Sequence, residues 1–543
     1  MKKTLVIHPF LFAIFPVLFL FSHNIAYLEY FQTLLPAIVT LGFTILLLLF
    51  FRLILKDNKK AGIVVSIFLI LFFSYGHIFN IMQDWKVGSF VIGRDSCLLL
   101  IFCILFAYGV YFIIKTHRTL HNLTHILNAV ATFLIVISLI KIGDYTYQTG
   151  ASWHDNSSKE SVEGTLINLE KPSKFPNIYY IILDAYARRD ILKEIYSYNN
   201  AEFINYLIKK GFYVANYSSS NYCQTVLSLA SSLNFTYLND LTNRVGVESN
   251  NNKLLKNMIR DNHTFRFLKQ YGYVTVAFDA STWGPVQTKN VDIYYTTPGW
   301  DMDLFYNELI NTTPLSVLLK GLRELNIMQQ YDFHRKKILN AFDKLEDISK
   351  QKVPIFVFAH ILAPHQPFVF GEQGEAITPN RKRFTIWYTL QEGRSKEEYI
   401  ESYKKQLSFI NKKVQETIDK IISNSPEPPI IILQADHGPS AMLDCENPYN
   451  TNLKERMSIL NAYYLPNKGH KYLYDTISPV NTFRIILNQY FGANYEILKD
   501  ESYFSTWSHP YKFINVTGNI NSNIDIKCRT NNILLYKKSV EKE

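Results

Sequence analysis

Apolar residues dominate the first part of the chain, in runs about as long as a membrane-spanning helix requires. Five of these runs approach the ~20 residues needed to cross a bilayer: 6–24, 33–54, 61–82, 96–115 and 123–142. The first run follows Lys2 and Lys3, as in a secretory signal peptide, but no small-residue cleavage site comes after it. We therefore favour an uncleaved span, which predicts a membrane domain of five transmembrane helices over residues 1–145.

Basic residues gather in alternate loops between these runs. On one side they are Lys2, Lys3, Arg52, Lys56, Lys59, Lys60, Lys115 and Arg118. The other two loops, 25–32 and 83–95, carry only Lys86 and Arg94, which three acidic residues offset. Because cytoplasmic loops are enriched in Lys and Arg, this pattern predicts a cytoplasmic N-terminus and places everything after residue 145 outside the membrane.

After a polar linker over 146–175, short apolar runs end abruptly at polar residues. The predicted strands lie within 177–184, 273–279, 353–360 and 429–438. Runs of this kind are typical of strands buried on both faces of a parallel sheet. Helical patterns lie between them, including an amphipathic stripe over 396–423. The pattern predicts an α/β domain with a central, mostly parallel sheet over 176–515, and a tail over 516–543.

Candidate chemistry stands where these strands end. Asp184 follows the first strand, and Asp436, His437 and Gly438 follow the last one. Ligands bind outside the carboxyl ends of parallel strands, and carboxylates beside an imidazole suit Zn²⁺ or Mn²⁺. The alternatives are a helix N-cap for Asp184 and a plain turn for Asp-His-Gly.

Two further positions add to this picture. Thr225 stands where a polar loop runs into a helix of small and apolar residues, and a helix N-terminus favours anions. Its hydroxyl is either an N-cap or a nucleophile activated by a metal. His360 and His365 follow the third strand. A lone histidine is more often structural, but two at one sheet edge are compatible with a site.

The composition of the chain limits the classes of partner that it is expected to bind. The chain is 48% hydrophobic and carries a formal charge of +10. In a membrane protein this charge is explained by anionic lipid surfaces, and no basic run interleaved with aromatic residues supports a nucleic-acid partner. Of five cysteines, two lie in an apolar run. The remaining three, Cys223, Cys445 and Cys528, leave open which pair, if any, forms a disulfide.

In chain order, an Asp after the first strand, a hydroxyl at a helix start, a His-x4-His loop and a late Asp-His-Gly resemble the alkaline phosphatase superfamily, in its sulfatase-like branch. Behind five spans, the pattern is similar to membrane-bound phosphoethanolamine transferases and lipoteichoic acid synthase-like proteins. The resemblance covers residues 1–145 by architecture and 176–510 by motif. It implies metal ligands at Asp184, Thr225, Asp436 and His437, with Thr225 as nucleophile, and contacts to substrate phosphate or a second metal at His360 and His365.

This resemblance implies an enzyme of a bacterial-type inner membrane with its catalytic domain on the periplasmic side. A divalent metal, Zn²⁺ or Mn²⁺, would assist transfer of a phosphoethanolamine or phosphoglycerol headgroup. The donor would be a membrane phospholipid, and the acceptor an envelope lipid or glycan. The alternatives are a sulfatase-like hydrolase, acting on phosphodiesters or sulfuric esters, and a non-catalytic membrane protein that keeps the fold.

Two departures from the family pattern matter. Sulfatases that form formylglycine have Pro and Arg after the reactive Cys or Ser, and neither follows Cys223. Relatives often have a histidine soon after Asp-His-Gly, whereas residues 439–455 contain none. These differences argue against a formylglycine sulfatase and against a complete second metal site. Lys454, Arg456 and His509 are the remaining candidates for contact with an anion.

Overall fold

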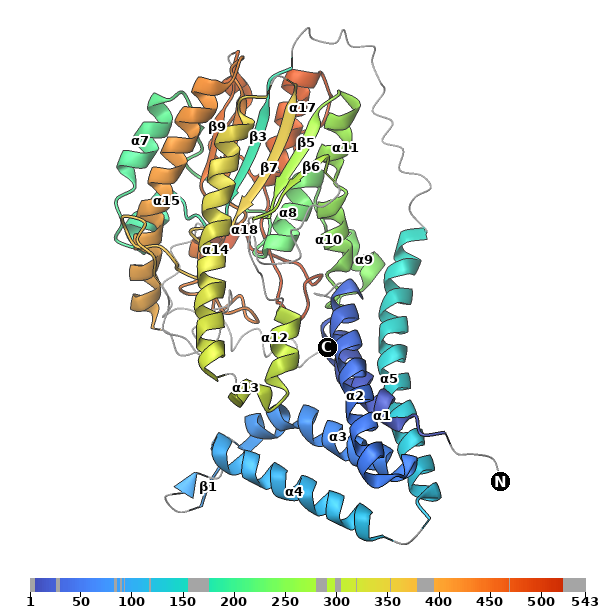
Figure 1. Cartoon of the computed structure of the whole chain (residues 1–543). Coiled ribbons are helices and arrows are strands. Elements are labelled where there is room, and N and C mark those ends of the chain that lie inside the picture. Colours follow the sequence, from blue (N-terminus) through green and yellow to red (C-terminus); the bar gives the residue numbers. More distant parts are fainter. Residues whose placement is uncertain are drawn as a thin grey trace, which may run out of the picture. The chain divides into compact units, whose positions relative to one another are not determined.

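The computed structural model describes residues 5–25, 30–82, 85–87, 90–91, 93–116, 119–154, 175–279, 291–297, 304–318, 320–351, 353–377, 395–467 and 469–520. Lys2, Lys3, Arg118, Cys528, most of the predicted linker (155–174) and residues 521–543 of the tail lie outside these ranges. The described residues form two compact units. One consists of the N-terminal helices together with residues 304–333, and the other of the remaining described residues from 175 onward (Figure 1).

The first unit is helical. Its elements are α1 (His8–Asn24), η1 (Tyr30–Thr33), α2 (Leu34–Leu55), α3 (Asn58–Met82), the hairpin of β1 (Lys86–Val87) and β2 (Phe90–Val91), α4 (Asp95–Lys115) and α5 (His121–His154). The helices α2 to α5 are each long and apolar enough to cross a membrane. Helix α1, with 17 residues, is shorter than these four and spans about 26 Å. The chain is therefore an integral membrane protein, as its hydrophobic pattern predicts.

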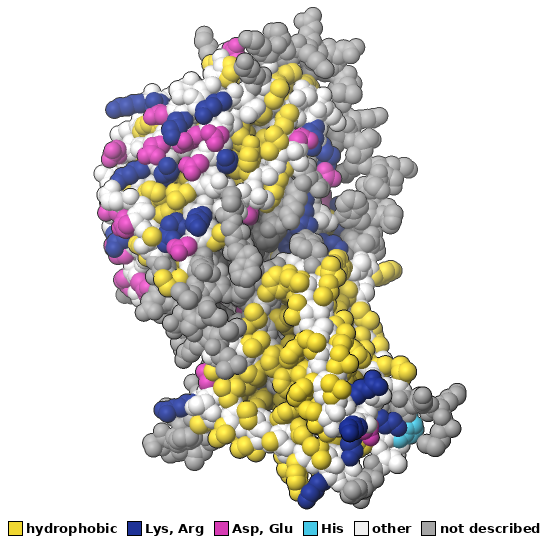
Figure 2. Space-filling view, viewed as in Figure 1, with side chains coloured by type: hydrophobic (Ala, Val, Ile, Leu, Met, Phe, Trp, Pro, Cys, Tyr) yellow, Lys and Arg dark blue, Asp and Glu magenta, His cyan; other side chains and the backbone are white. Residues whose placement is uncertain are grey.

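Apolar side chains cover the surface of these helices. Leu46 is 66% exposed and Leu53 is 78% exposed, both on α2. Figure 2 shows hydrophobic side chains across the helical unit, whereas acidic and basic side chains are scattered over the α/β unit. A surface of this kind is stable in lipid and would aggregate in water.

The helical unit brings its basic loops to one end. The ammonium group of Lys60, at the start of α3, donates to the carbonyl oxygens of Ile114 (3.0 Å) and Thr116 (3.2 Å), at the end of α4. The start of α1 lies beside α5, where the His8 N–H donates to Asn128 Oδ1 at 2.9 Å. The start of α1, the α2–α3 loop and the end of α4 therefore share one end of the bundle.

Two short helices from far along the chain also belong to this unit. They are α12 (Leu304–Asn311) and α13 (Leu315–Leu318). Phe305 and Leu309 pack against buried residues of α1. The Gly76 N–H donates to the Thr312 carbonyl oxygen at 2.9 Å, an approach that leaves no room for a Cβ atom at residue 76.

The second unit is built on a seven-stranded sheet. Its strand order is β4 (Tyr213–Val214), β9 (Asn461–Tyr464), β8 (Ile430–Gln434), β3 (Ile178–Leu183), β7 (Ile355–Ile361), β5 (Val274–Phe278) and β6 (Ile293–Tyr295). The strands from β8 to β6 pair in parallel, whereas β9 runs antiparallel to β8 and to β4. The predicted α/β fold with a mostly parallel sheet is confirmed.

Helices cover both faces of this sheet (Figure 1). One face packs against α8 (Thr225–Asn234), α10 (Lys253–Arg260), α11 (His263–Gln270) and α17 (Pro479–Phe491). On the other side lie α7 (Ala201–Lys209), the part of α14 (Lys320–Ile348) from residue 334 onward, and α15 (Lys396–Asn424). The stripe predicted on α15 is buried, and Ser395 is the N-cap of the helix, where its side chain accepts the Glu398 N–H. The smaller elements are α6 (Arg189–Glu194), α9 (Leu241–Val245), α16 (Leu453–Met457), η4 (Gly469–Tyr472), β10 (Tyr503–Phe504), β11 (Ile514–Asn515) and α18 (Thr517–Ile520).

Candidate active site

Asp184 is the first residue beyond β3, and the chain turns sharply after it. Ala185 has φ of +63°, a left-handed conformation that costs a non-glycine residue about 1 kcal/mol or more. The turn is held by Tyr403 of α15, whose hydroxyl donates to the Ala185 carbonyl oxygen (2.9 Å) and accepts the Ala187 N–H (3.1 Å). The amphipathic pattern over 396–423 predicts only a packing role for Tyr403. A hydroxyl within an otherwise apolar stripe is the signal that could have indicated a further role.

Asp436 comes from the neighbouring strand, β8. Because β3 and β8 are parallel and Ile182 pairs with Gln434, the residues two positions further on meet at the same sheet edge. The Ala185 N–H donates to Asp436 Oδ1 at 3.3 Å. The Ser228 hydroxyl of α8 donates to the Asp436 backbone carbonyl at 2.7 Å, so this serine anchors the loop.

The ring of His437 has a defined tautomer. Its Nδ1 lies 3.0 Å from the Gly438 carbonyl oxygen, which can only accept, so Nδ1 carries the proton. The lone pair of Nε2 is then free to accept the Thr225 hydroxyl at 2.9 Å. Burial and the nearby Arg456 guanidinium hold the pKa of His437 well below its ordinary value. The imidazole is therefore neutral, which is the form that binds metals.

Thr225 is the first residue of α8, and Gln224 occupies the N-cap position with extended backbone. The N–H groups of Leu227 and Ser228 bond to the Gln224 carbonyl oxygen, at 3.1 and 2.9 Å. The Thr225 hydroxyl points to His437 instead of capping the helix. Only 8% of Thr225 is exposed, so its hydroxyl is held at the helix start next to the Asp436–His437 pair.

The atoms around this hydroxyl suit a cation. Within the described part of the chain, Asp184 Oδ1 and Asp436 Oδ2 are buried and accept no hydrogen bond. The unprotonated His437 Nε2 lies 3.3 Å from Asp436 Oδ2 and 3.8 Å from Asp184 Oδ1. Buried carboxylate oxygens without a donor are costly. A divalent cation would satisfy all three lone pairs, so these residues fit the metal that the motif implies.

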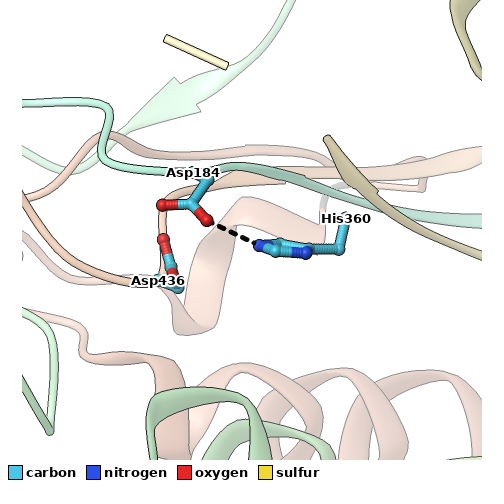
Figure 3. Close-up of side chains that lie close together, drawn as sticks. All are labelled: Asp184, His360 and Asp436. Carbon is cyan, nitrogen blue, oxygen red and sulfur yellow. Dashed lines mark hydrogen bonds and ion pairs between the residues drawn. The ribbon is translucent and has the colours of Figure 1, made fainter. Parts of the chain in front are cut away.

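His360, expected to contact substrate phosphate or a second metal, is in direct contact with this cluster. It is opposite Ile182 in the β3–β7 register, and its Nε2 donates to Asp184 Oδ2 at 3.0 Å (Figure 3). One potential ligand atom from each of Asp184, His360 and Asp436 lies within 4.8 Å of the others. His360 is also 4% exposed. The His360 ring therefore contacts the Asp184 carboxylate, where it can either orient Asp184 or share the ion.

The two carboxyl groups differ in their electrostatic environment. Burial raises the pKa of Asp184, but His365, His360 and His437 outweigh it and hold this pKa below its ordinary value. Burial and the charge of Asp184 together raise the pKa of Asp436, to about 7. In the absence of a cation, Asp184 carries the negative charge, and the Asp436 carboxyl group is partly protonated at neutral pH.

His365 is brought near the same centre. Its backbone N–H donates to the Asp184 carbonyl oxygen at 3.0 Å, and its ring centroid is 6.2 Å from that of His437. Nδ1 donates to the Gln366 carbonyl oxygen, so Nε2 carries the lone pair. Burial lowers the pKa of His365, which keeps the ring neutral at pH 7. All six predicted site residues therefore lie at one edge of the sheet.

Cys223 is close in sequence to Thr225 but differs in environment. Its thiol is fully buried, donates to the Ser505 carbonyl oxygen and accepts the Ser505 N–H, both at 3.4 Å. Burial raises the pKa of this thiol to about 11, which suppresses the thiolate. Cys223 and Cys445 are both free.

The three candidates for anion contact are engaged elsewhere. Lys454 pairs with Glu194 at 2.6 Å, and His509 pairs with Glu248 at 3.1 Å. The Arg456 guanidinium is buried and bonded to backbone carbonyl oxygens. The sequence offers Arg456 as a candidate but gives no indication of these contacts, the longest of which join segments more than 200 residues apart.

The sulfatase family model matches residues 176–478, which contain every residue of the cluster. No curated protein sequence matches the chain significantly.

Several solved structures resemble the chain at low identity. The C-terminal periplasmic domain of EcEptC from Escherichia coli aligns at 13% identity and a TM-score of 0.41, over 66% of this chain and 96% of that one. Phosphoethanolamine transferase EptA from Neisseria meningitidis aligns at 12% and 0.37, over 89% and 95%. A putative sulfatase from Bacteroides thetaiotaomicron aligns at 11% and 0.40, over 62% and 75%. At these scores, the assignment to a family rests on the family model.

Proposed function

The chain belongs to the sulfatase family, and on this premise we propose that it transfers a phosphoryl-linked headgroup from a membrane phospholipid to an envelope lipid or glycan. The observation that supports this most is the Thr225 hydroxyl, held 2.9 Å from His437 Nε2 beside two buried carboxylate oxygens without donors. A hydroxyl nucleophile next to a cation site is the arrangement that phosphoryl transfer needs.

A divalent cation, Zn²⁺ or Mn²⁺, fits the mixed oxygen and nitrogen donors of Asp184, Asp436, His437 and Thr225. When bound, it would lower the pKa of the Thr225 hydroxyl and neutralise phosphate oxygens. Thr225 is the first residue of α8, and the N-terminus of a helix favours an anion. His360 would keep Asp184 oriented through the 3.0 Å hydrogen bond.

The chemistry of the chain's own residues then follows in two steps. Thr225 Oγ1 forms a bond to phosphorus while the bond from phosphorus to the oxygen of the lipid's glycerol breaks. His365, with a free lone pair on Nε2, would pass the proton lost by Thr225 to the leaving oxygen. In the second step His365 would take a proton from an acceptor hydroxyl, whose oxygen displaces Thr225. Phosphoethanolamine and phosphoglycerol are the headgroups that this scheme accommodates.

The test follows the covalent bond on Thr225. Purified protein in detergent is mixed with phosphatidylethanolamine or phosphatidylglycerol carrying a labelled headgroup, quenched, and analysed by peptide mass spectrometry. We expect the label on Thr225, and Thr225→Ala should form no adduct and lose about 10⁴-fold or more in turnover.

Cys223→Ala and Ser228→Ala are the matched controls, from the same segment of chain. Both should keep the adduct, since the thiol is buried away from the cluster and the serine only anchors the Asp436 carbonyl. A label on Cys223, or full turnover by Thr225→Ala, would contradict the proposal.

A hydrolase is the second candidate function, because the matching family model is that of sulfatases. A phosphodiesterase or sulfuric ester hydrolase would use the same cluster with water as the acceptor. Product analysis separates the two: a hydrolase releases the free headgroup without an acceptor, whereas a transferase needs the acceptor for multiple turnovers.

We also propose an orientation of the chain in the membrane, from its basic loops. The basic loops share one end of the helical unit, through Lys60 and its contacts with α4. The positive-inside rule would place that end in the cytoplasm and the α/β unit on the periplasmic side of an inner membrane. A phosphatase reporter fused after Ile142 should then be active and a cytoplasmic reporter inactive. The reverse result would remove outer-leaflet lipids as donors.

A further inference from the structure

Arg456 connects the two loops that carry the proposed nucleophile and one proposed metal ligand. Its Nε and Nη2 donate to the Cys223 carbonyl oxygen at 2.8 and 2.6 Å. Its Nη1 donates to the Gly438 carbonyl oxygen and to Ser440 Oγ, each at 2.9 Å. Cys223 lies two residues before Thr225, and Gly438 follows His437 directly, so one planar group spans both loops.

The backbone of Arg456 holds the same loop. The Gly438 N–H donates to the Arg456 carbonyl oxygen at 2.7 Å. A Cβ atom on Gly438 would lie 2.0 Å from the Glu455 carbonyl oxygen, so the approach requires glycine. Since Gly438 bonds to both the guanidinium and the main chain of Arg456, the turn after His437 has little freedom to move relative to α16.

The Arg456 guanidinium donates its hydrogen bonds to neutral groups. Arg456 is 3% exposed, and its charge interacts at longer range with the buried carboxyl groups of Asp436 and Glu455. Its guanidinium instead bonds to neutral oxygens and lies 5.8 Å from the centroid of the Trp507 ring. A buried cation is expensive to desolvate, so stability alone is a weak reason for its presence. Its fixed fork of donors is a better reason, because lysine cannot reproduce it.

We infer that Arg456 is a positioning residue that sets the distance between the Thr225 hydroxyl and His437. The inference rests on the proposed function and goes beyond the residues that motif and family supply. Nε, Nη1 and Nη2 of the guanidinium all donate to oxygens of the protein itself. Arg456 is therefore expected to change how fast the adduct forms, not how tightly the lipid binds.

The experiment measures single-turnover adduct formation by the full chain in detergent, with labelled phosphatidylethanolamine and, separately, labelled phosphatidylglycerol. The parent is compared with Arg456→Lys, Ser440→Ala and Lys454→Met. Lys454→Met is the matched control, because it lies on the same short helix and its ammonium group pairs with Glu194 at the surface. Bound metal per chain and the melting temperature are measured for every variant.

We expect Arg456→Lys to lower the maximal rate of adduct formation about 10²-fold, as a misplacement of about 1 Å does. The lipid concentration at half-saturation and the bound metal should match the parent. Ser440→Ala removes one acceptor and keeps the cation, so it should lower the maximal rate by about 2- to 10-fold. If Arg456→Lys does not fold, the test depends on Ser440→Ala. A maximal rate in Ser440→Ala equal to that of the parent would then overturn the inference. Lys454→Met should behave as the parent.

Three results would overturn the inference: a parental maximal rate in Arg456→Lys, a raised half-saturation with an unchanged maximal rate, or an equal loss in Lys454→Met. The second would make Arg456 a substrate contact. If the parent itself forms no adduct with either lipid, the proposed function fails and the inference fails with it. An adduct in the parent together with a parental rate in Arg456→Lys removes the inference alone.

Discussion

The ends of β3 and β8 begin from the same local pattern and arrive at opposite electrostatic states. Each is a buried apolar strand that stops at an aspartate, and the two strands are neighbours in the sheet. Asp184 meets three imidazoles and keeps its charge, whereas Asp436 meets the charge of Asp184 and has a raised pKa. The pattern of a strand can place a carboxylate, but the neighbours that the fold supplies decide its protonation.

The two aspartates also differ in their contacts. Asp184 is tied to His360 and His365, through its side chain and its backbone carbonyl. Asp436 Oδ1 accepts a 3.3 Å bond from the Ala185 N–H, and its other oxygen faces His437. We therefore expect removal of either charge to abolish metal binding, but with different effects on the metal-free fold.

The largest effect is expected from paired substitutions. Asp184→Asn and Asp436→Asn should both lose stoichiometric metal, measured by elemental analysis of the purified protein. Without metal, Asp184→Asn should melt below the parent, because the His360 hydrogen bond loses its charged acceptor. Asp436→Asn should melt at or above the parent, because a like charge next to Asp184 is removed. Equal changes in the two melting temperatures would contradict the asymmetry. Asp261→Asn, at an exposed site, serves as the control.

An intermediate effect is expected from His360→Gln, which tests whether the β7 side chain supports Asp184. Glutamine keeps a donor but not the imidazole geometry, so metal affinity should fall by about 10- to 100-fold, as for other residues that orient a ligand. Isothermal titration of the metal-free protein with Zn²⁺ measures this. A complete loss of binding would instead make His360 a direct ligand.

The smallest effect is expected from pH. The pKa of Asp436 is raised in the folded protein, so its contribution to stability is present below its unfolded value of 3.8 and is lost as pH rises through about 7. The pKa of Asp184 is lowered, so its contribution is constant at neutral pH. The melting temperature of metal-free protein should fall by roughly a few degrees between pH 5 and pH 8 relative to Asp436→Asn. Parallel melting curves for the two proteins would show that Asp436 does not titrate in this range.

The sequence by itself determined the elements and the kind of chemistry. Runs of apolar residues have a length and a period that follow from the bilayer and from the helix and strand repeats, so the spans, the parallel strands and the α15 stripe could be predicted locally. Parallel strands all end at one sheet edge, which is why the strand pattern alone places Asp184, Asp436, His437, His360 and His365 together.

Only the tertiary structure decided which atoms meet. The Asp184–His360 bond joins residues 176 positions apart, and the Thr225–His437 bond joins residues 212 apart. The Arg456 contacts and the packing of α12 on α1 depend in the same way on side chains from distant segments. No local period encodes such pairs, because each depends on the register and facing of elements that are set by packing across the whole unit.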